Sequence, residues 1–174
     1  MDKQVPLIKL RPCEPEDLEL LYSIENDPEL WNTSNNEGPY SRYAIKNYIA
    51  SAQPIQACGE LRLVIEVTLS FGYHKAIGVV DLTNYSALSA RAEVGIALLK
   101  KFRGLGYGKQ ALTLLEEFAT KRLKIHLLYA LVDSKNITSE KLFKNSDYQV
   151  ISELPEWQYN EGEYRTLTLF AKFF

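Results

Sequence analysis

The stretch Arg103-Gly104-Leu105-Gly106-Tyr107-Gly108 places three glycines within five positions. Glycine lets backbone N–H groups approach a bulky group closely. Apolar side chains follow at positions 111, 114, 115 and 118, a spacing that predicts a helix over 109–119. A helix that begins at a glycine-rich turn presents unpaired N–H groups and the positive end of its dipole at one place. This stretch therefore predicts an anion site.

The glycine spacing excludes two common nucleotide motifs. A Walker loop has four residues between its first glycine and a Gly-Lys pair followed by Ser or Thr, whereas Gly104 and Gly108 enclose three and Gln110 follows Lys109. A dinucleotide fingerprint runs G-x-G-x-x-G, and here the order is G-x-G-x-G. Arg103, Gly106 and Gly108 instead satisfy [Gln/Arg]-x-x-Gly-x-[Gly/Ala]. The alternative is a turn whose glycines only cap a helix.

This loop, set between a strand-like run and a helix, resembles the pyrophosphate loop of the GCN5-related N-acetyltransferases (GNAT superfamily), which bind acetyl-coenzyme A. A second fingerprint of that superfamily, Asn-x-x-Ser with a hydroxyl-bearing residue four positions later, is similar to Asn136, Ser139 and Phe143. Phe143 departs from it because its ring has no hydroxyl. The alternative here is that Asn136 caps a helix and Phe143 belongs to the core.

The resemblance covers essentially the whole chain. It is closest to the branch that contains spermidine acetyltransferases and ribosomal-protein N-terminal acetyltransferases. The residues that carry this narrower likeness are 10–12, 16–18, 91–93, 132–133 with 136, and 162 with 164–165.

Composition limits the function classes. Lys plus Arg total 20 against 22 Asp plus Glu, so no net charge recruits nucleic acid or an anionic membrane. No run approaches the ~20 apolar residues of a membrane span, and residues 1–4 do not resemble a signal peptide, so we expect a cytoplasmic location. Cys13 and Cys58 are expected to be packed thiols, and the two histidines predict no metal site.

The chain is expected to form a single domain over 1–174, of α/β class with a mixed sheet. Residues 26–40 are polar and predict a connection, Ser41 is expected to cap a helix, and residues 84–90 predict a turn. The resemblance implies a GNAT-like fold of six to seven mostly antiparallel strands, with one central parallel pair and helices on both faces. The predicted strands are 7–11, 61–69, 76–82, 91–99, 126–132, a strand beginning at 148–151, and 164–173; the predicted helices are 14–25, 42–52, 109–119 and 137–145.

The resemblance implies acetyl-CoA as co-substrate and a set of residues that hold it. Main-chain N–H groups around Ile96, Ala97 and Leu98 would face the pantetheine arm and the acetyl oxygen. The other residues implied in cofactor binding are Arg103, Gly104, Leu105, Gly106, Tyr107, Gly108, Lys109, Asn136, Ser139 and Phe143.

The implied reaction is attack of a primary amine on the acetyl thioester. An alkylamine with a pKa near ~10.4 is only about one part in two thousand neutral at pH 7, so a base or water relay must take its proton. Glu93 is the first candidate and Asp81 the second, although either could be a solvent-facing carboxylate. The family's usual tyrosine acid falls at Phe143, so Tyr148, Tyr129, Ser139 or water is expected to replace it.

Two acceptor classes stay open: a small polyamine-like amine and a peptide N-terminus. Glu25, Asp27, Glu29 and Glu37 could attract a polyamine, but we interpret them as solvated acids beside turns. Glu37, Asp81 and Trp157 are the predicted substrate-binding residues, with a peptide lying beside the Trp157 hairpin. A catalytically weak acetyl-CoA-binding module is the alternative function. The aromatic tail at 170–174 would suit a homodimer surface as well as a core edge.

Overall fold

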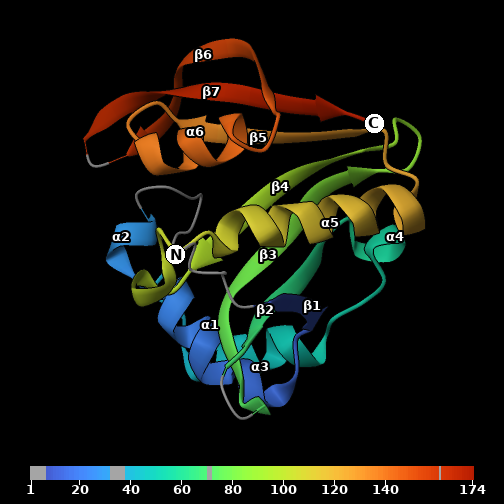
Figure 1. The fold of residues 1–174 in the computed structure, drawn as a ribbon. Helices are drawn as coiled ribbons and strands as arrows, with labels where there is room; N and C mark the ends of the chain where they lie inside the picture. Colours follow the sequence, from blue (N-terminus) through green and yellow to red (C-terminus); the bar gives the residue numbers. More distant parts are fainter. Residues whose placement is uncertain (1–6, 32–37, 70–71, 161) are drawn as a thin grey trace, which may run out of the picture.

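The computed structural model describes residues 7–31, 38–69, 72–160 and 162–174. Within them one sheet has the strand order β1-β2-β3-β4-β5-β7-β6 (Figure 1). Every neighbouring pair is antiparallel except β4 and β5, which run parallel. The expected fold class is therefore confirmed. The strands are β1 (Ile8–Pro12), β2 (Leu61–Thr68), β3 (His74–Ser86), β4 (Arg91–Leu98), β5 (Leu127–Asp133), β6 (Gln149–Asn160) and β7 (Glu163–Phe173).

Helices cover both faces of this sheet (Figure 1). One face packs Ala111, Leu112 and Leu115 of the long helix α5 against buried side chains of β3 and β4. The other face packs Leu21 and Ile45, from two N-terminal helices, around Val79. The helical elements are η1 (Pro15–Asp17), α1 (Leu18–Glu25), α2 (Pro28–Trp31), α3 (Arg42–Ala50), α4 (Ile55–Cys58), η3 (Lys100–Phe102), α5 (Tyr107–Leu123) and α6 (Ile137–Lys144).

The parallel pair at the centre of the sheet is short. Arg91, Ala92 and Glu93 pair with residues 127–129, and from Val94 onward β4 pairs only with β3. β5 continues beside β7 instead, so the two strands diverge toward α2 and the glycine-rich loop (Figure 1). Backbone N–H and C=O groups on the open side of β4 therefore lack a strand partner, and unpaired backbone groups are ready to bind something else.

Three segments differ from the sequence-based expectations. Residues 28–31 form α2 inside the expected connection, because Asp27 accepts a hydrogen bond from the Glu29 N–H at 3.0 Å and Pro28 suits a first helical turn. β3 extends to Ser86, so the turn covers only 87–90. Residues 55–58 form the short helix α4, where no helix is expected. The strand expected to begin at 148–151 is β6, which runs from Gln149 to Asn160. The cap at Ser41 is confirmed, since its hydroxyl accepts from the Ala44 N–H at 3.1 Å.

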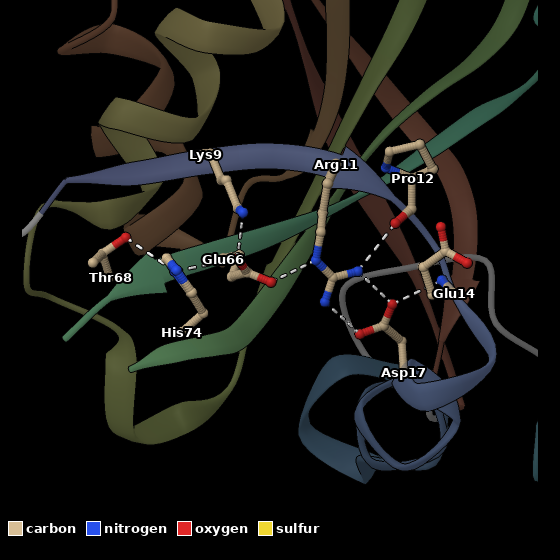
Figure 2. Close-up of polar contacts among 8 residues, drawn as sticks. All are labelled: Lys9, Arg11, Pro12, Glu14, Asp17, Glu66, Thr68 and His74. Atoms are coloured by element: carbon tan, nitrogen blue, oxygen red, sulfur yellow. Dashed lines mark hydrogen bonds and ion pairs between the residues drawn. The ribbon is translucent and has the colours of Figure 1, made fainter. Parts of the chain in front are cut away.

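A cluster of charged side chains ties the first strand to the helix that follows it (Figure 2). Arg11 donates to both oxygens of Asp17, at 2.6 and 2.8 Å, and to Glu66 at 2.6 Å. Lys9 approaches the other oxygen of Glu66 at 2.8 Å, and His74 lies 3.5 Å from the same oxygen. Asp17 and Glu66 are buried, so the cluster is a compensated set of charges that joins β1, β2, β3 and η1.

Candidate active site

The glycine-rich loop adopts the backbone that its sequence predicts. Gly104 and Gly106 have φ values of +73° and +85°, in the left-handed region that favours glycine, and Gly106 is the N-cap of α5. Within the described part of the chain, the backbone N–H groups of 105–109 have no hydrogen-bond acceptor. The loop therefore offers a row of free donors at the positive end of a helix of 17 residues.

The Arg103 side chain is engaged by groups outside the glycine-rich loop. Its Nε donates to the Leu98 carbonyl at 2.8 Å, while the guanidinium nitrogens lie 3.4 Å from Asp27 and from Glu29. Lys100 also pairs with Glu29. Arg103 thus ties the end of β4 to α2, and Lys109 is left as the cation nearest the loop's free N–H groups in sequence.

A cavity of about 470 Å³ opens beside the loop, and we call it the glycine-loop cavity. It collects most of the residues expected to bind the cofactor, from the end of β4, the loop and the start of α6. Its lining residues are Glu29, Leu30, Ile96, Ala97, Leu98, Arg103, Gly104, Gly106, Gly108, Lys109, Asn136, Thr138, Ser139, Leu142 and Asn145.

Three of the residues expected at the cofactor lie outside this lining. Leu105 is exposed, whereas Tyr107 is buried with its ring edge-on to Phe102. Phe143 is 3% exposed and stacks on Phe170 in the core. Leu142, one position earlier, faces the cavity instead and would lie 3.4 Å from a Cβ built at Gly108. Leu142 therefore packs at ordinary contact distance over Gly108.

Asn136 has a structural task as well as a place in the cavity wall. Its side-chain oxygen accepts the Ser139 N–H at 3.0 Å, which makes it the N-cap of α6. A cap of this kind stabilises the start of a helix by about 1 kcal/mol. Asn136 can therefore be both a helix cap and a cofactor-binding residue, because the capped end of α6 is also one side of the cavity.

A second cavity, of about 550 Å³, continues along the same strand, and we call it the Glu93 cavity. Its wall includes Gly95, and the wall of the glycine-loop cavity includes Ile96, so consecutive residues of β4 line the two cavities. It brings together Glu93, Asp81 and Trp157, which are distant in sequence. Its lining residues are Glu25, Tyr40, Arg62, Asp81, Thr83, Asn84, Glu93, Val94, Gly95, Leu131, Trp157, Gln158 and Leu167.

Arg62 holds two of the carboxylates in this cavity. Its Nε and one terminal nitrogen donate to the two oxygens of Asp81 at 2.8 and 3.0 Å, and the other nitrogen donates to Glu25. Burial alone would lower the pKa of Arg62, but the charge of Asp81 raises it, so the guanidinium stays charged. Glu25 and Asp81 are therefore paired acids in a cavity wall, and the interpretation of either as a solvated acid is wrong.

A smaller space of about 300 Å³ adjoins the Glu93 cavity and shares Glu25, Tyr40 and Arg62 with it. Tyr48 lines this space with its ring 5.4 Å from the Arg62 guanidinium carbon, and burial raises the pKa of Tyr48 to about 12. Glu60 adds a further carboxylate. The region behind the Glu93 cavity is thus aromatic and acidic.

Glu93 lies in a row of side chains across three strands, between Thr83 of β3 and Tyr129 of β5. Asn84 donates its side-chain N–H to Glu93 Oε2 at 2.8 Å. Burial, followed by the negative charge of Glu93, raises the pKa of Tyr129, so that hydroxyl stays protonated at neutral pH. A carboxylate with a cavity before it is able to accept a proton.

The structure does not bring Tyr148 to either cavity. The residue is 4% exposed with its ring edge-on to Phe143, and burial followed by the charge of Glu116 raises the pKa of Tyr148 far above its usual value. Its hydroxyl has no hydrogen-bond partner among the described residues. Tyr148 therefore lies in the core, away from the cavity walls that a proton donor would need to reach.

The remaining candidates divide between described and undescribed parts of the chain. Glu37 lies outside the described residues. Cys13 is half-buried, and burial raises the pKa of its thiol to about 11, whereas Cys58 is exposed rather than packed. In the described ranges, no three His, Cys, Asp or Glu side chains are grouped as a metal site requires, and no helix there is long and apolar enough to cross a membrane.

Comparison with known proteins gives this geometry a family context. Residues 8–149 match the family model described as an acetyltransferase (GNAT) domain. The chain is 25% identical over 158 residues to the spermidine N(1)-acetyltransferase of Escherichia coli strain K12, covering 91% of this chain and 81% of that protein.

Solved structures share the fold at lower sequence identity. Spermidine N-acetyltransferase from Vibrio cholerae, solved with CoA and spermine, superposes with a TM-score of 0.86 at 19% identity over 95% of each chain. The ribosomal L7/L12 alpha-N-protein acetyltransferase RimL, solved with coenzyme A, gives 0.82 at 16% identity over 95% of this chain and 93% of that one. The Vibrio cholerae enzyme has also been solved as a dodecamer.

Proposed function

The chain belongs to the acetyltransferase (GNAT) domain family, and from this premise we propose that it uses acetyl-CoA to acetylate a primary amine by direct attack in a ternary complex. The observation that carries this proposal is that consecutive residues of β4, Gly95 and Ile96, line two different cavities. One begins at a row of free backbone donors, and the other contains a carboxylate able to accept a proton. Two substrates entering from opposite ends would meet near Gly95 and Ile96.

The glycine-loop cavity has the features that a nucleotide thioester needs. The free N–H groups of 105–109 suit a diphosphate, because they combine donors with a helix dipole, and Lys109 adds positive charge. The space between β4 and α6 suits the extended pantetheine arm, with apolar contact from Leu142 and polar contact from Asn136.

In the proposed reaction, an ammonium in the Glu93 cavity gives one proton to the Glu93 carboxylate. The neutral amine then attacks the thioester carbonyl, and unpaired N–H groups on the open side of β4 stabilise the oxyanion. The attack forms the C–N bond, and collapse of the tetrahedral intermediate then re-forms the C=O double bond and breaks the C–S bond. The second proton of the amine nitrogen neutralises the leaving thiolate through water, which suffices because a thiol pKa near ~8.5 makes thiolate a fairly good leaving group.

Charge in the Glu93 cavity supports a cationic acceptor. Glu25, Asp81 and Glu93 line it against the single guanidinium of Arg62, so the described lining has an excess of negative charge. A polyamine-like small molecule and a protein N-terminal amine both satisfy this condition. The names of the similar proteins support the same two classes, since one set acetylates spermidine and the other a ribosomal protein N-terminus.

A catalytically weak acetyl-CoA-binding module is the second candidate, and one observation favours it. Phe143 occupies the position where the family motif has a hydroxyl, and the hydroxyl of nearby Tyr148 is buried in the core. Changing Phe143→Tyr separates the candidates. A gain in turnover of tenfold or more supports the weak module, whereas a change of less than twofold supports an enzyme that already has a proton route.

The primary test combines binding and turnover. Calorimetry with coenzyme A should give a 1:1 isotherm, and acetyl transfer should follow with at least one amine from a panel of polyamines, aminoglycosides, amino acids and N-terminal peptides. Binding without transfer to any amine favours the binding module. No binding of coenzyme A contradicts both candidates.

A further inference from the structure

Asn84 lies at an irregular point of β3. The pairing of β3 with β4 shifts between Thr83 and Ser86, and Asn84 has a φ of +50°. Residues other than glycine rarely occupy this left-handed region, although asparagine tolerates it better than most. Irregularities of this kind commonly redirect a side chain next to a functional site. The turn expected over 84–90 does not by itself explain the positive φ of Asn84 or the direction in which its side chain points.

The irregular backbone brings the Asn84 amide to Glu93. Asn84 Nδ2 donates to Glu93 Oε2 at 2.8 Å, and both residues line the Glu93 cavity. A hydrogen bond to an ionised carboxylate is shorter and stronger than one between neutral groups. The carboxylate also faces the Tyr129 hydroxyl, and it lines the cavity, where a bound group could reach it.

Tyr129 completes the surroundings of Glu93 on the opposite strand. It pairs with Glu93 across the short parallel segment, and the raised pKa of its hydroxyl reflects burial and then the Glu93 charge. Glu93 is thus flanked by neutral hydrogen-bonding side chains on both neighbouring strands. Of these contacts, the one from Asn84 is the bond with a defined length and direction.

We propose that Asn84 is a positioning residue that fixes the Glu93 carboxylate for removing the proton of the acceptor amine. The inference rests on the proposed function, because it gives Glu93 the role of proton acceptor. The proton passes from the ammonium nitrogen to Glu93 Oε1, and the Asn84 amide keeps its own protons throughout. Asn84 acts through Glu93 and takes no part in the proton transfer itself.

A purely structural role for Asn84 makes a different prediction. If Asn84 only closed the irregular strand, its loss would lower stability and leave turnover unchanged. Asn84→Gly separates the two roles, because glycine accepts a positive φ without strain while the amide group is removed. Ala90→Gly is the matched control, since Ala90 has a φ of +46° in the next turn of the same strand pair.

We expect Asn84→Gly to lower kcat about 5- to 10-fold, the scale of one hydrogen bond to a charged group. The KM for acetyl-CoA and the Tm should stay at wild-type values, and Ala90→Gly should keep wild-type kcat. In a Glu93→Gln background, adding Asn84→Gly should lower kcat by less than twofold further. A kcat within twofold of wild type for Asn84→Gly, or an equal loss in the Glu93→Gln background, overturns the proposal.

A second readout does not depend on turnover. The side-chain ¹H–¹⁵N signal of Asn84 should shift strongly in Glu93→Gln, because its carboxylate acceptor is lost, and should stay in place in the control Ala90→Gly. An unchanged signal in Glu93→Gln overturns the inference even in an active enzyme. Failure of the proposed function is distinguishable, because it would show as wild-type protein that transfers no acetyl group while this signal still shifts.

Discussion

The two cavities lined by consecutive residues of β4 differ in the groups that form their walls. The glycine-loop cavity presents backbone N–H groups from consecutive residues, and the identity of several side chains there matters little. The Glu93 cavity presents side chains from α1, β2, β3, β4 and β6, held by the ion pairs of Arg62. The backbone-built site suits a group common to many enzymes, whereas the side-chain-built site is where a particular acceptor can be selected.

The largest expected effect breaks the side-chain-built cavity alone. Glu93→Gln keeps the shape of the side chain but removes its ability to accept a proton, so we expect kcat to fall by at least ~100-fold. The affinity for coenzyme A measured by calorimetry should stay within twofold of wild type. Wild-type turnover in this variant would show that another group takes the proton.

The next effect breaks the backbone-built cavity alone. Gly106→Val forces a β-branched residue to a φ of +85° and fills the approach to the loop, so coenzyme A affinity should fall at least ~30-fold. Gly59→Val is the control, because Gly59 has a φ of +76° with no atom within 4 Å of an added Cβ. Equal losses of affinity in the two variants would mean that general destabilisation is responsible.

A pair of arginines sharpens the comparison. Arg62 and Arg11 each hold two carboxylates, and the Arg11 cluster is drawn in Figure 2. Arg62 lines the Glu93 cavity, whereas Arg11 is not among the residues that line the three cavities described above. Arg62→Met and Arg11→Met should each lower the free energy of unfolding by about 2–3 kcal/mol, because each leaves partly buried carboxylates uncompensated. Only Arg62→Met should also change the KM for the acceptor. A matching change of KM in Arg11→Met would remove the distinction between the two clusters.

The Arg11 cluster predicts that the stability of the fold decreases at acid pH, independently of either cavity. Burial alone would raise the pKa of Asp17, but hydrogen bonds from Arg11 lower it, and the same holds for Glu66 with Lys9 and Arg11. A carboxylate with a depressed folded pKa stabilises the protein above its unfolded pKa, near ~4, and this contribution is lost as pH falls through the folded value. Asp17→Asn should therefore lower Tm at pH 7, with a difference from wild type that narrows below about pH 4.

The smallest expected effect is at Tyr148, outside both cavities. Its buried hydroxyl has no partner within the described ranges, so Tyr148→Phe removes an unsatisfied polar group at almost constant volume. We expect kcat within twofold of wild type and an equal or higher Tm by calorimetry. A fall in kcat of tenfold or more would contradict this prediction and indicate that Tyr148 acts as a proton donor.

The contrast between the backbone-built and the side-chain-built cavity also explains how much of the site the sequence could predict. The glycine loop and the Asn136 helix are contiguous motifs, so their place at one cavity followed from strand and helix order. The helix α2 was missed because four residues carry little periodicity. The Arg62 cluster joins residues 19 and 37 positions apart, so no local pattern reveals it. The signal that could have suggested it is the charge of Arg62 near the start of the mostly apolar strand β2.

Asn84 shows a different limit. Its residue type and neighbours favour a turn, and the pairing that extends β3 to Ser86 depends on the register with β4. Phe143 was placed by its motif position, but stacking on Phe170 turns its ring to the core and leaves Leu142 at the cavity. Both outcomes depend on contacts between distant segments.

One residue without a side chain permits the close approach of β3 to the part of β4 that lines the glycine-loop cavity. A Cβ built on Gly78 of β3 would lie 2.3 Å from the Ala97 carbonyl oxygen of β4, far inside contact distance. Even a methyl group there would push β4 away from β3, and the space on its other side is the opening toward β5. The hydrogen atom at Gly78 thus keeps β4 in the position in which, under the proposed function, an acyl donor and its acceptor come into line.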